Sequence, residues 1–151
     1  MSRESSLYPE LARTIAPAEG KLGVLIPGLG AVATTLIAGV HLVNKGLGKP
    51  YGSLTQLQRL RLGKRTNPRF VPIKELVPLA DPSALVFGGW DIFPEDAYQT
   101  ACDAGVLPAE MLTQVRRELE SIKPWPGVFE QDYVRNLHGT HIKSAPTKMH
   151  L

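Results

Sequence analysis

Apolar and polar positions change along the chain from one regular pattern to the next. Residues 22–26 form a short apolar run bounded by a lysine and a proline, which predicts a strand buried on both faces. Residues 31–45 then predict a helix that is apolar nearly all round and ends at Gly46. Residues 84–87 repeat the pattern of a buried strand, which ends at two glycines. The chain thus begins as strand, helix and strand.

The segment between these two strands is ambiguous. Leucines recur at helical spacing over residues 54–60, after Ser53, which is a fair helix N-cap. Residues 59–62 alternate arginine and leucine as an edge strand does, so a helix and a strand both stay open. Residues 70–76 predict a short strand in which Pro72 marks an edge or a strand start.

The second half of the chain has helical patterns. One helix begins at Asp91 or just after it, with Pro94 near its first position, and closes at Gly105. Residues 108–123 predict an amphipathic helix, and residues 131–137 carry a weaker helical pattern. The apolar stripe of the amphipathic helix is Met111, Val115, Leu119 and Ile122.

This order of elements predicts an α/β fold, namely a partial doubly wound (Rossmann-like) parallel sheet with flanking helices. Such a fold uses about six parallel strands, and the chain offers two or three. We therefore expect a sheet that is incomplete toward the C-terminus. We expect residues 1–20 to form a polar N-terminal arm with one helical turn near residues 8–15, and residues 21–151 to form the N-terminal portion of a larger Rossmann-like domain.

Composition narrows the class of protein. With 151 residues, 43% of them hydrophobic, the chain can bury a core, which excludes a disordered tail or a disulfide-stapled peptide. The net charge of +3 does not call for nucleic acid. The single cysteine, Cys102, fits a reducing cytosol and a small core residue. Residues 22–43 carry no charge, but Pro27 and the glycines after it break the run, so we expect a cytoplasmic protein without a membrane span.

A glycine-rich turn is the leading functional motif. Gly28-x-Gly30-x-x-Ala33 follows a strand and opens a helix, as in dinucleotide-binding folds. The first glycine allows the tight turn, the second lets the backbone approach a pyrophosphate, and the small third residue lets helix and strand pack closely. The pattern predicts nucleotide binding, with a tight strand-to-helix corner as the alternative.

Dinucleotide-binding folds usually have an acidic residue about 20 residues after the glycine-rich turn, where it binds the ribose hydroxyls, and this chain lacks one there. That stretch holds Asn44, Lys45 and Lys49, which suggest either a 2′-phosphate and NADP or, as the better interpretation, solvated cations at a helix end. Asp91 is the candidate ribose acid because it follows the second strong strand, and a helix N-cap is its alternative role.

Other polar clusters give weaker predictions. Five cations over residues 59–69 suggest a solvated charged segment more than a phosphate or RNA surface, since no aromatic residue is interleaved before Phe70. His138, His141 and His150 have no cysteine partner, so we predict no metal site. No nucleophile with a base, and no pair of catalytic carboxylates, is evident.

Three motifs together resemble the myo-inositol phosphate synthase (inositol-3-phosphate synthase) family in its bacterial form. They are Gly28-Leu29-Gly30-Ala31-Val32-Ala33-Thr34-Thr35, then Gly52-Ser53-Leu54-Thr55-Gln56, then Val86-Phe87-Gly88-Gly89-Trp90-Asp91-Ile92. Residues 124–129 also look like the loop of that family after its amphipathic helix. The resemblance covers nearly all the chain from residue 21 onward.

The resemblance implies an NAD-dependent isomerase, usually a homotetramer, that converts D-glucose 6-phosphate to inositol phosphate by oxidation at C5, enolisation, aldol closure and return of the hydride. It implies that Gly28, Leu29, Gly30, Ala31 and Val32 hold the pyrophosphate of NAD and that Asp91 contacts its adenosine side. Family chains are several times longer, and their catalytic residues lie in a later domain. The resemblance therefore implies no catalytic residue in this chain, which alone would be inactive. A stand-alone dinucleotide-binding module and a small basic RNA-binding protein are the alternatives.

Overall fold

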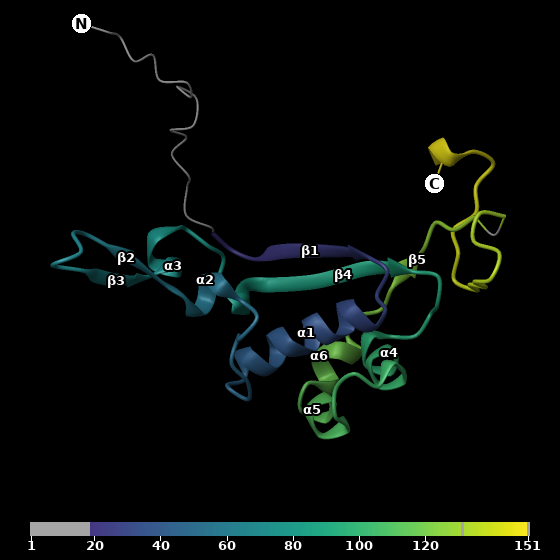
Figure 1. Ribbon diagram of the computed structural model, residues 1–151. Coiled ribbons are helices and arrows are strands. Elements are labelled where there is room, and N and C mark those ends of the chain that lie inside the picture. Colours follow the sequence, from purple (N-terminus) through teal and green to yellow (C-terminus); the bar gives the residue numbers. More distant parts are fainter. Residues whose placement is uncertain (1–18, 131, 151) are drawn as a thin grey trace, which may run out of the picture.

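Three parallel strands form the sheet of the molecule, shown in Figure 1. The computed structural model describes residues 19–130 and 132–150. Strand β1 (Leu22–Pro27) pairs with β4 (Leu85–Asp91), and β4 pairs with β5 (Trp125–Pro126). The predicted α/β fold with a partial parallel sheet is confirmed. The predicted N-terminal arm lies outside the described residues except for residues 19 and 20.

The strands differ from the prediction in length and number. Strand β4 runs on through Gly88 and Gly89 to Asp91 instead of ending at the glycines. A Cβ atom at Gly89 would collide with the carbonyl oxygen of Ile26, so a glycine here lets the two strands approach closely. Strand β5 was predicted as a loop, because two residues that include a proline carry no strand pattern of their own.

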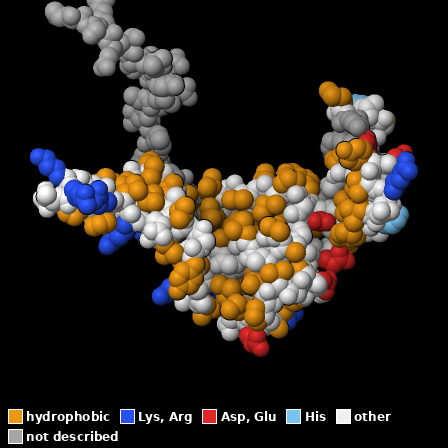
Figure 2. All heavy atoms as spheres, in the orientation of Figure 1, with side chains coloured by type: hydrophobic (Ala, Val, Ile, Leu, Met, Phe, Trp, Pro, Cys, Tyr) orange, Lys and Arg blue, Asp and Glu red, His pale blue; other side chains and the backbone are white. Residues whose placement is uncertain are grey.

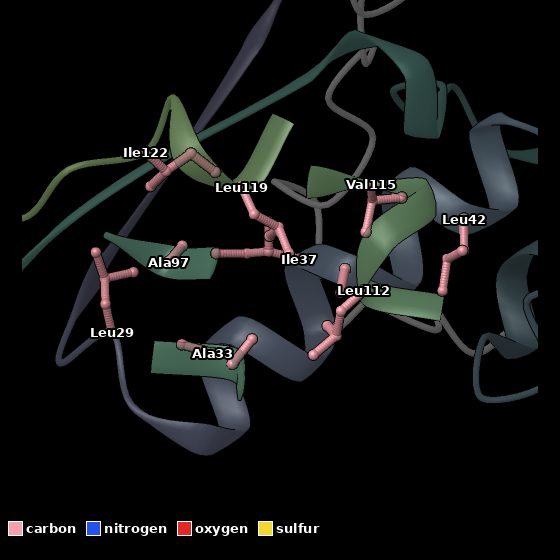
Figure 3. Close-up of a cluster of buried hydrophobic side chains, with 11 residues drawn as sticks. Leu29, Ala33, Ile37, Leu42, Ala97, Leu112, Val115, Leu119 and Ile122 are labelled. Atoms are coloured by element: carbon pink, nitrogen blue, oxygen red, sulfur yellow. The ribbon is translucent and has the colours of Figure 1, made fainter. Parts of the chain in front are cut away.

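Helices cover one face of this sheet (Figure 1). They are α1 (Ala31–Asn44), α4 (Ala97–Ala104), α5 (Ala109–Gln114) and α6 (Arg116–Glu120). Side chains from all four helices and from the glycine turn meet in one core (Figure 3). The largest fully buried members are Leu29, Ile37, Leu112, Val115 and Leu119, and the polar Thr34 is also fully buried.

The predicted single helix over residues 108–123 is wrong. The chain leaves helical geometry at Val115, where φ is −119° and ψ is 17°, and this separates α5 from α6. Val115 is completely buried, while Met111 is 45% exposed and Leu112 takes its place in the core. Packing against α1 therefore overrides the helical pattern at this point.

Helix ends follow local signals more closely. Helix α1 ends as predicted, because Gly46 has a φ of +71° and the N–H of Leu47 donates to the carbonyl of Leu42 at 2.9 Å. Helix α4 closes at Gly105, also as predicted, with a φ of +63°. It begins at Ala97 instead of near Asp91, since the carboxylate of its N-cap Asp96 accepts the N–H groups of Tyr98 and Gln99 at 3.0 and 2.9 Å.

The second face of the sheet is open in the described part of the chain. Residues 22–26 were predicted to be buried on both faces, yet Leu25 is 58% exposed on this face. Trp90 and Trp125 lie on this face with ring centroids 5.2 Å apart. The prediction fails because the four helices all pack on the other side (Figure 1).

The ambiguous segment contains both predicted structures. Helix α2 (Leu54–Leu57) is followed by β2 (Arg59–Leu62), which pairs with β3 (Arg69–Pro72) in an antiparallel hairpin apart from the main sheet. Pro72 thus ends a strand instead of starting one, while the prediction of an edge position is confirmed because β3 pairs with β2 alone; α3 (Ile73–Leu76) follows it. Two 3₁₀ turns, η1 (Pro82–Ala84) and η2 (Lys148–His150), complete the elements.

Two further predictions fail. Residues 132–136 form turns instead of a helix. Cys102 is exposed instead of belonging to the core, because it lies on the solvent side of α4. No helix among the described residues is long and apolar enough to cross a bilayer.

Candidate functional site

The turn between β1 and α1 presents free backbone N–H groups. Gly28 has a φ of +95°, which favours glycine, and its N–H donates to the carbonyl of Trp90 at 2.7 Å. The first bond of α1 runs from the N–H of Thr34 to the carbonyl of Gly30 at 3.0 Å. The N–H groups of residues 31–33 therefore have no partner within the helix. Such a helix start is a site for an anion.

A cavity of about 620 Å³ opens at this helix start. Its size lies in the range of small-molecule and cofactor sites, roughly 300–1,000 Å³. The glycine turn and the first turn of α1 form one side, and the end of β4 forms another. The remaining wall is apolar and consists of Ile92, Phe93, Val128, Phe129 and Leu137.

Asp91 connects the end of β4 to the glycine turn. Its Oδ2 accepts the N–H of Leu29 at 2.7 Å, and its Oδ1 accepts the N–H of Phe93 at 3.1 Å. The alternative role of a helix N-cap is wrong, since Asp96 caps α4. The carboxylate stands at the edge of the cavity and fixes the position of the turn, as a residue at the carboxyl end of a parallel strand can.

The other predicted site residues contribute in different ways. Gly28, Gly30, Ala31 and Val32 all line the cavity. A Cβ atom at Gly28 or Gly30 would meet no other atom within 4 Å, so both glycines border open space. The side chain of Leu29 is 2% exposed and belongs to the core, which leaves only its backbone near the cavity.

Residues near the C-terminus form the far wall, which sequence reasoning missed. The N–H of Gly127 donates to the carbonyls of Asp91 and His141, both at 3.0 Å, and the N–H of His141 donates to the carbonyl of Ile92 at 2.8 Å. These backbone bonds hold residues 127–129 beside the end of β4. The only signal for this wall was the family-like motif over residues 124–129.

The lysine considered for a 2′-phosphate lies at the other end of α1. Lys45 donates from Nζ to the carbonyl of Gln114 at 2.6 Å and pairs with Glu118 Oε1 at 2.8 Å. Asn44 donates to the carbonyl of Pro82 at 3.1 Å. Lys45 is therefore neither a phosphate ligand at this cavity nor a fully solvated cation, because it ties α1 to α5 and α6.

Two titratable groups near Lys45 have shifted pKa values. The hydrogen bond from Lys45 lowers the pKa of Glu118 below its ordinary value. Burial lowers the pKa of His41, and the nearby Glu118 carboxylate partly opposes that effect. These shifts belong to the packing of α1 against α6, away from the cavity.

The histidines considered for metal binding have other contacts. His141 Nε2 lies 3.2 Å from the carbonyl oxygen of Pro124, and His150 Nδ1 lies 3.2 Å from the hydroxyl of Thr147. Over the described ranges, no three His, Cys, Asp or Glu side chains gather in a geometry that could hold a metal ion.

The sequence matches a family model for NAD binding, described as myo-inositol-1-phosphate synthase, over residues 22–150. Inositol-3-phosphate synthase 1 of Bacteroides thetaiotaomicron is 49% identical over 139 residues, which cover 91% of this chain and 32% of that protein. Inositol-3-phosphate synthase 1 of Oryza sativa is 35% identical over 137 residues, which cover 83% of this chain and 27% of that protein. The chain thus spans about a third or less of these relatives.

A solved structure has the same fold. The crystal structure of inositol-3-phosphate synthase from Caenorhabditis elegans superposes with a TM-score of 0.74 at 23% identity. The match covers 87% of this chain and 29% of the other. It supports the Rossmann-like arrangement described above.

Proposed function

The chain belongs to the myo-inositol-1-phosphate synthase family and to its NAD-binding part, and from this premise we propose that the cavity at the glycine turn binds the pyrophosphate and adenosine side of NAD. The single observation that carries this proposal is the open helix start at the cavity edge, with Gly30 before it and Asp91 beside it. When bound, NAD supplies the chemistry of accepting and returning a hydride.

The pyrophosphate would bind at the first turn of α1. The N–H groups of Ala31, Val32 and residue 33 are available there, and the helix dipole favours an anion. The first turn carries no acidic residue that would repel one. Gly30 leaves open space where a side chain would stand between the backbone and the phosphate oxygens. These features support binding through the backbone of Gly30 and the helix start, while Gly28 and Leu29, whose N–H groups bond the Trp90 carbonyl and the Asp91 carboxylate, would shape the turn.

Asp91 would accept a ribose hydroxyl. Each of its carboxylate oxygens accepts one backbone N–H, and an ionised carboxylate has about four acceptor positions, so capacity for a hydroxyl remains. Since Asp91 also holds Leu29, the same side chain would position the turn and bind the cofactor. This double role explains how the site works without an acid after the first helix.

The apolar wall would receive the adenine ring. Phe93, Phe129 and Leu137 line the cavity opposite the glycine turn. Aromatic and aliphatic side chains are the usual neighbours of a flat apolar ring system in such a cavity.

For the whole protein we propose the inositol-3-phosphate synthase reaction, which feeds inositol and phospholipid biosynthesis. D-Glucose 6-phosphate would be oxidised at C5, enolised, closed by aldol addition and reduced to 1D-myo-inositol 3-phosphate. The described residues would contribute cofactor binding and no catalytic group. A cytoplasmic location and a homotetrameric assembly are part of the same proposal.

The cofactor proposal is tested by Gly30→Val. We expect calorimetry to show at least a hundredfold loss of NAD affinity, since the added side chain blocks the approach of the pyrophosphate. Circular dichroism should show an intact fold because Gly30 has an ordinary φ of −70°. Gly39→Val, further along α1, is the matched control and should keep NAD affinity, as a Cβ there meets nothing within 4 Å. Unchanged NAD binding by folded Gly30→Val protein would overturn the assignment.

The proposal that these residues bind NAD but supply no catalytic group is tested by assaying the conversion of glucose 6-phosphate in the presence of NAD. Residues 1–151 alone should bind NAD and give no product, whereas a full-length family member should give inositol phosphate. Turnover by the isolated residues at the rate of the full-length enzyme would contradict the absence of catalytic groups. NAD binding with no turnover in any longer form of the protein would favour the stand-alone module.

A further inference from the structure

Charge is strongly segregated along this chain. Residues 20–74 contain nine Lys and Arg and no Asp or Glu, whereas residues 75–132 contain eleven Asp and Glu and three Lys and Arg. Figure 2 shows blue side chains gathered at the hairpin end of the molecule, red ones below α5 and toward the C-terminal segment, and further blue ones on the C-terminal segment itself. We call the hairpin of residues 59–72 the basic end and the acid-rich residues 75–132 the acidic end, although the segment after them, residues 133–150, holds Arg135, Lys143 and Lys148 and no acid.

The basic end is the β2–β3 hairpin. Its tip turns at Gly63, where φ is +85°, and the strands pair Arg61 with Phe70. The cations are exposed, and the ion pairs of the described chain include none of them. Leu60 and Phe70 are exposed on the same hairpin at 48% and 56%. The five cations are Arg59, Arg61, Lys64, Arg65 and Arg69.

The acidic end includes the corner between α4 and α5. Asp103 lies on the last turn of α4 and Glu110 on the first turn of α5, and both are exposed. Between and beside them Val106 and Met111 are exposed at 56% and 45%. The corner thus combines apolar side chains with two acids, and the nearby Arg116, which lies 5.0 Å from the Tyr98 ring centroid, is paired with Glu120.

We propose that the β2–β3 hairpin of one copy docks on the α4–α5 corner of a second copy. Opposite charges would surround apolar contacts of Leu60 and Phe70 with Val106 and Met111, which is the usual arrangement of a protein interface. A single-stranded nucleic acid fits less well, because several aromatic side chains normally form its stacking platform and the hairpin offers only Phe70 among its described residues.

The interface is independent of the cofactor site. None of the residues of the hairpin or of the corner lines the cavity at the glycine turn. A substitution in the hairpin or the corner should therefore change self-association and leave NAD affinity unchanged, which tests this proposal alone. A substitution at the cavity should change NAD affinity and leave self-association unchanged, which tests the cofactor assignment alone.

Sedimentation velocity of the 151-residue chain tests the proposal. Arg61→Glu/Arg65→Glu should weaken self-association at least tenfold at low salt, and raising the salt should weaken association of the unchanged protein, since salt screens exposed charges. Lys21→Glu/Lys123→Glu makes the same change in net charge outside both surfaces and should behave like the unchanged protein. NAD affinity should be the same in all three proteins.

Charge exchange identifies the partner surface. Asp103→Lys/Glu110→Lys should also dissociate alone, and mixing it with Arg61→Glu/Arg65→Glu protein should restore association. Failure of the mixture to associate would overturn the choice of the α4–α5 corner. Unchanged sedimentation of the hairpin variant, together with lost retention on immobilised polyuridylate, would overturn the proposal in favour of RNA.

Discussion

The two faces of the β1–β4 sheet are built from the same strands, but helices cover only one of them. On one face, Ile26 and Phe87 pack against the buried core of α1 and α4–α6. On the other, Leu25, Val86 and Trp90 alternate with them along the strands and remain exposed. Their side chains are as apolar as those of the covered face. The difference shows that an apolar run in sequence reports a capacity for burial, whereas burial itself depends on which elements pack nearby.

The covered face should carry most of the stability. Leu119, labelled in Figure 3, is a fully buried member of this core. Leu119→Ala should lower the free energy of unfolding by about 2–5 kcal/mol through lost burial and a residual cavity. Urea unfolding followed by circular dichroism measures the change. Leu54→Ala, at a residue 69% exposed, is the control. Equal unfolding midpoints for the two variants would contradict the assignment of the core to this face.

Local signals in the sequence predicted the elements that local chemistry determines. The glycines at 46 and 105 end α1 and α4 because their positive φ angles are easy for glycine alone. The strand–turn–helix motif and the candidate acid Asp91 were also found, and the structure brings them to one cavity. In each case a few neighbouring residues carry the whole signal.

The remaining features depend on contacts between distant segments. Strand β5 exists because Trp125 reaches the end of β4, and the break at Val115 exists because α5 and α6 both pack on α1. The wall at residues 127–129 is held by backbone bonds to Asp91, Ile92 and His141. None of these contacts leaves a periodic pattern in the sequence, so pattern reasoning could not find them.

Asp91 lies where the covered side of β4 reaches the cavity, and it should matter more for NAD than for folding. Asp91→Ala should weaken NAD binding by about 1.5–3 kcal/mol, the range for a hydrogen bond to a charged group. Calorimetry gives the affinity and thermal melting gives the stability. Asp103→Ala removes an exposed acid far from the cavity and should leave NAD affinity unchanged. A lower melting temperature with unchanged affinity would limit Asp91 to fixing the turn through Leu29.

The Lys45–Glu118 pair lies on the covered side, at the other end of α1. It should make a smaller and pH-dependent contribution to the free energy of unfolding. The hydrogen bond from Lys45 holds the pKa of Glu118 below its ordinary value. A lowered carboxyl pKa stabilises the fold above the unfolded value of about 4.3, and this contribution disappears as pH falls through the lower pKa of the folded state. Lys45→Met should therefore cost up to about 1 kcal/mol at neutral pH and less near pH 3.

Thermal melting from pH 8 to 3 checks this prediction, with Lys123→Met as the control at an exposed lysine. His41 adds a separate effect at higher pH. Burial lowers its pKa, so protonation favours the unfolded chain and stability falls as pH drops below about 6.5. Lys123→Met should keep this effect of His41 unchanged, whereas Lys45→Met should reduce it, because the Lys45 charge also lowers the pKa of His41. An equal loss of stability at pH 7 and pH 3 in Lys45→Met would show that the pair acts through packing alone.

Substitutions on the open face should have the smallest effect on the free energy of unfolding and the largest effect on association between molecules. Leu25 is 58% exposed on β1, so Leu25→Ser should change the free energy of unfolding by no more than about 0.5 kcal/mol. Removing apolar surface there should reduce light scattering at high protein concentration, because exposed apolar patches promote association. Leu47→Ser, at a residue 55% exposed beyond α1, is the matched control and should leave scattering unchanged. A stability loss in Leu25→Ser as large as that of Leu119→Ala would mean that this face is covered in solution, and the contrast between the two faces would then be wrong.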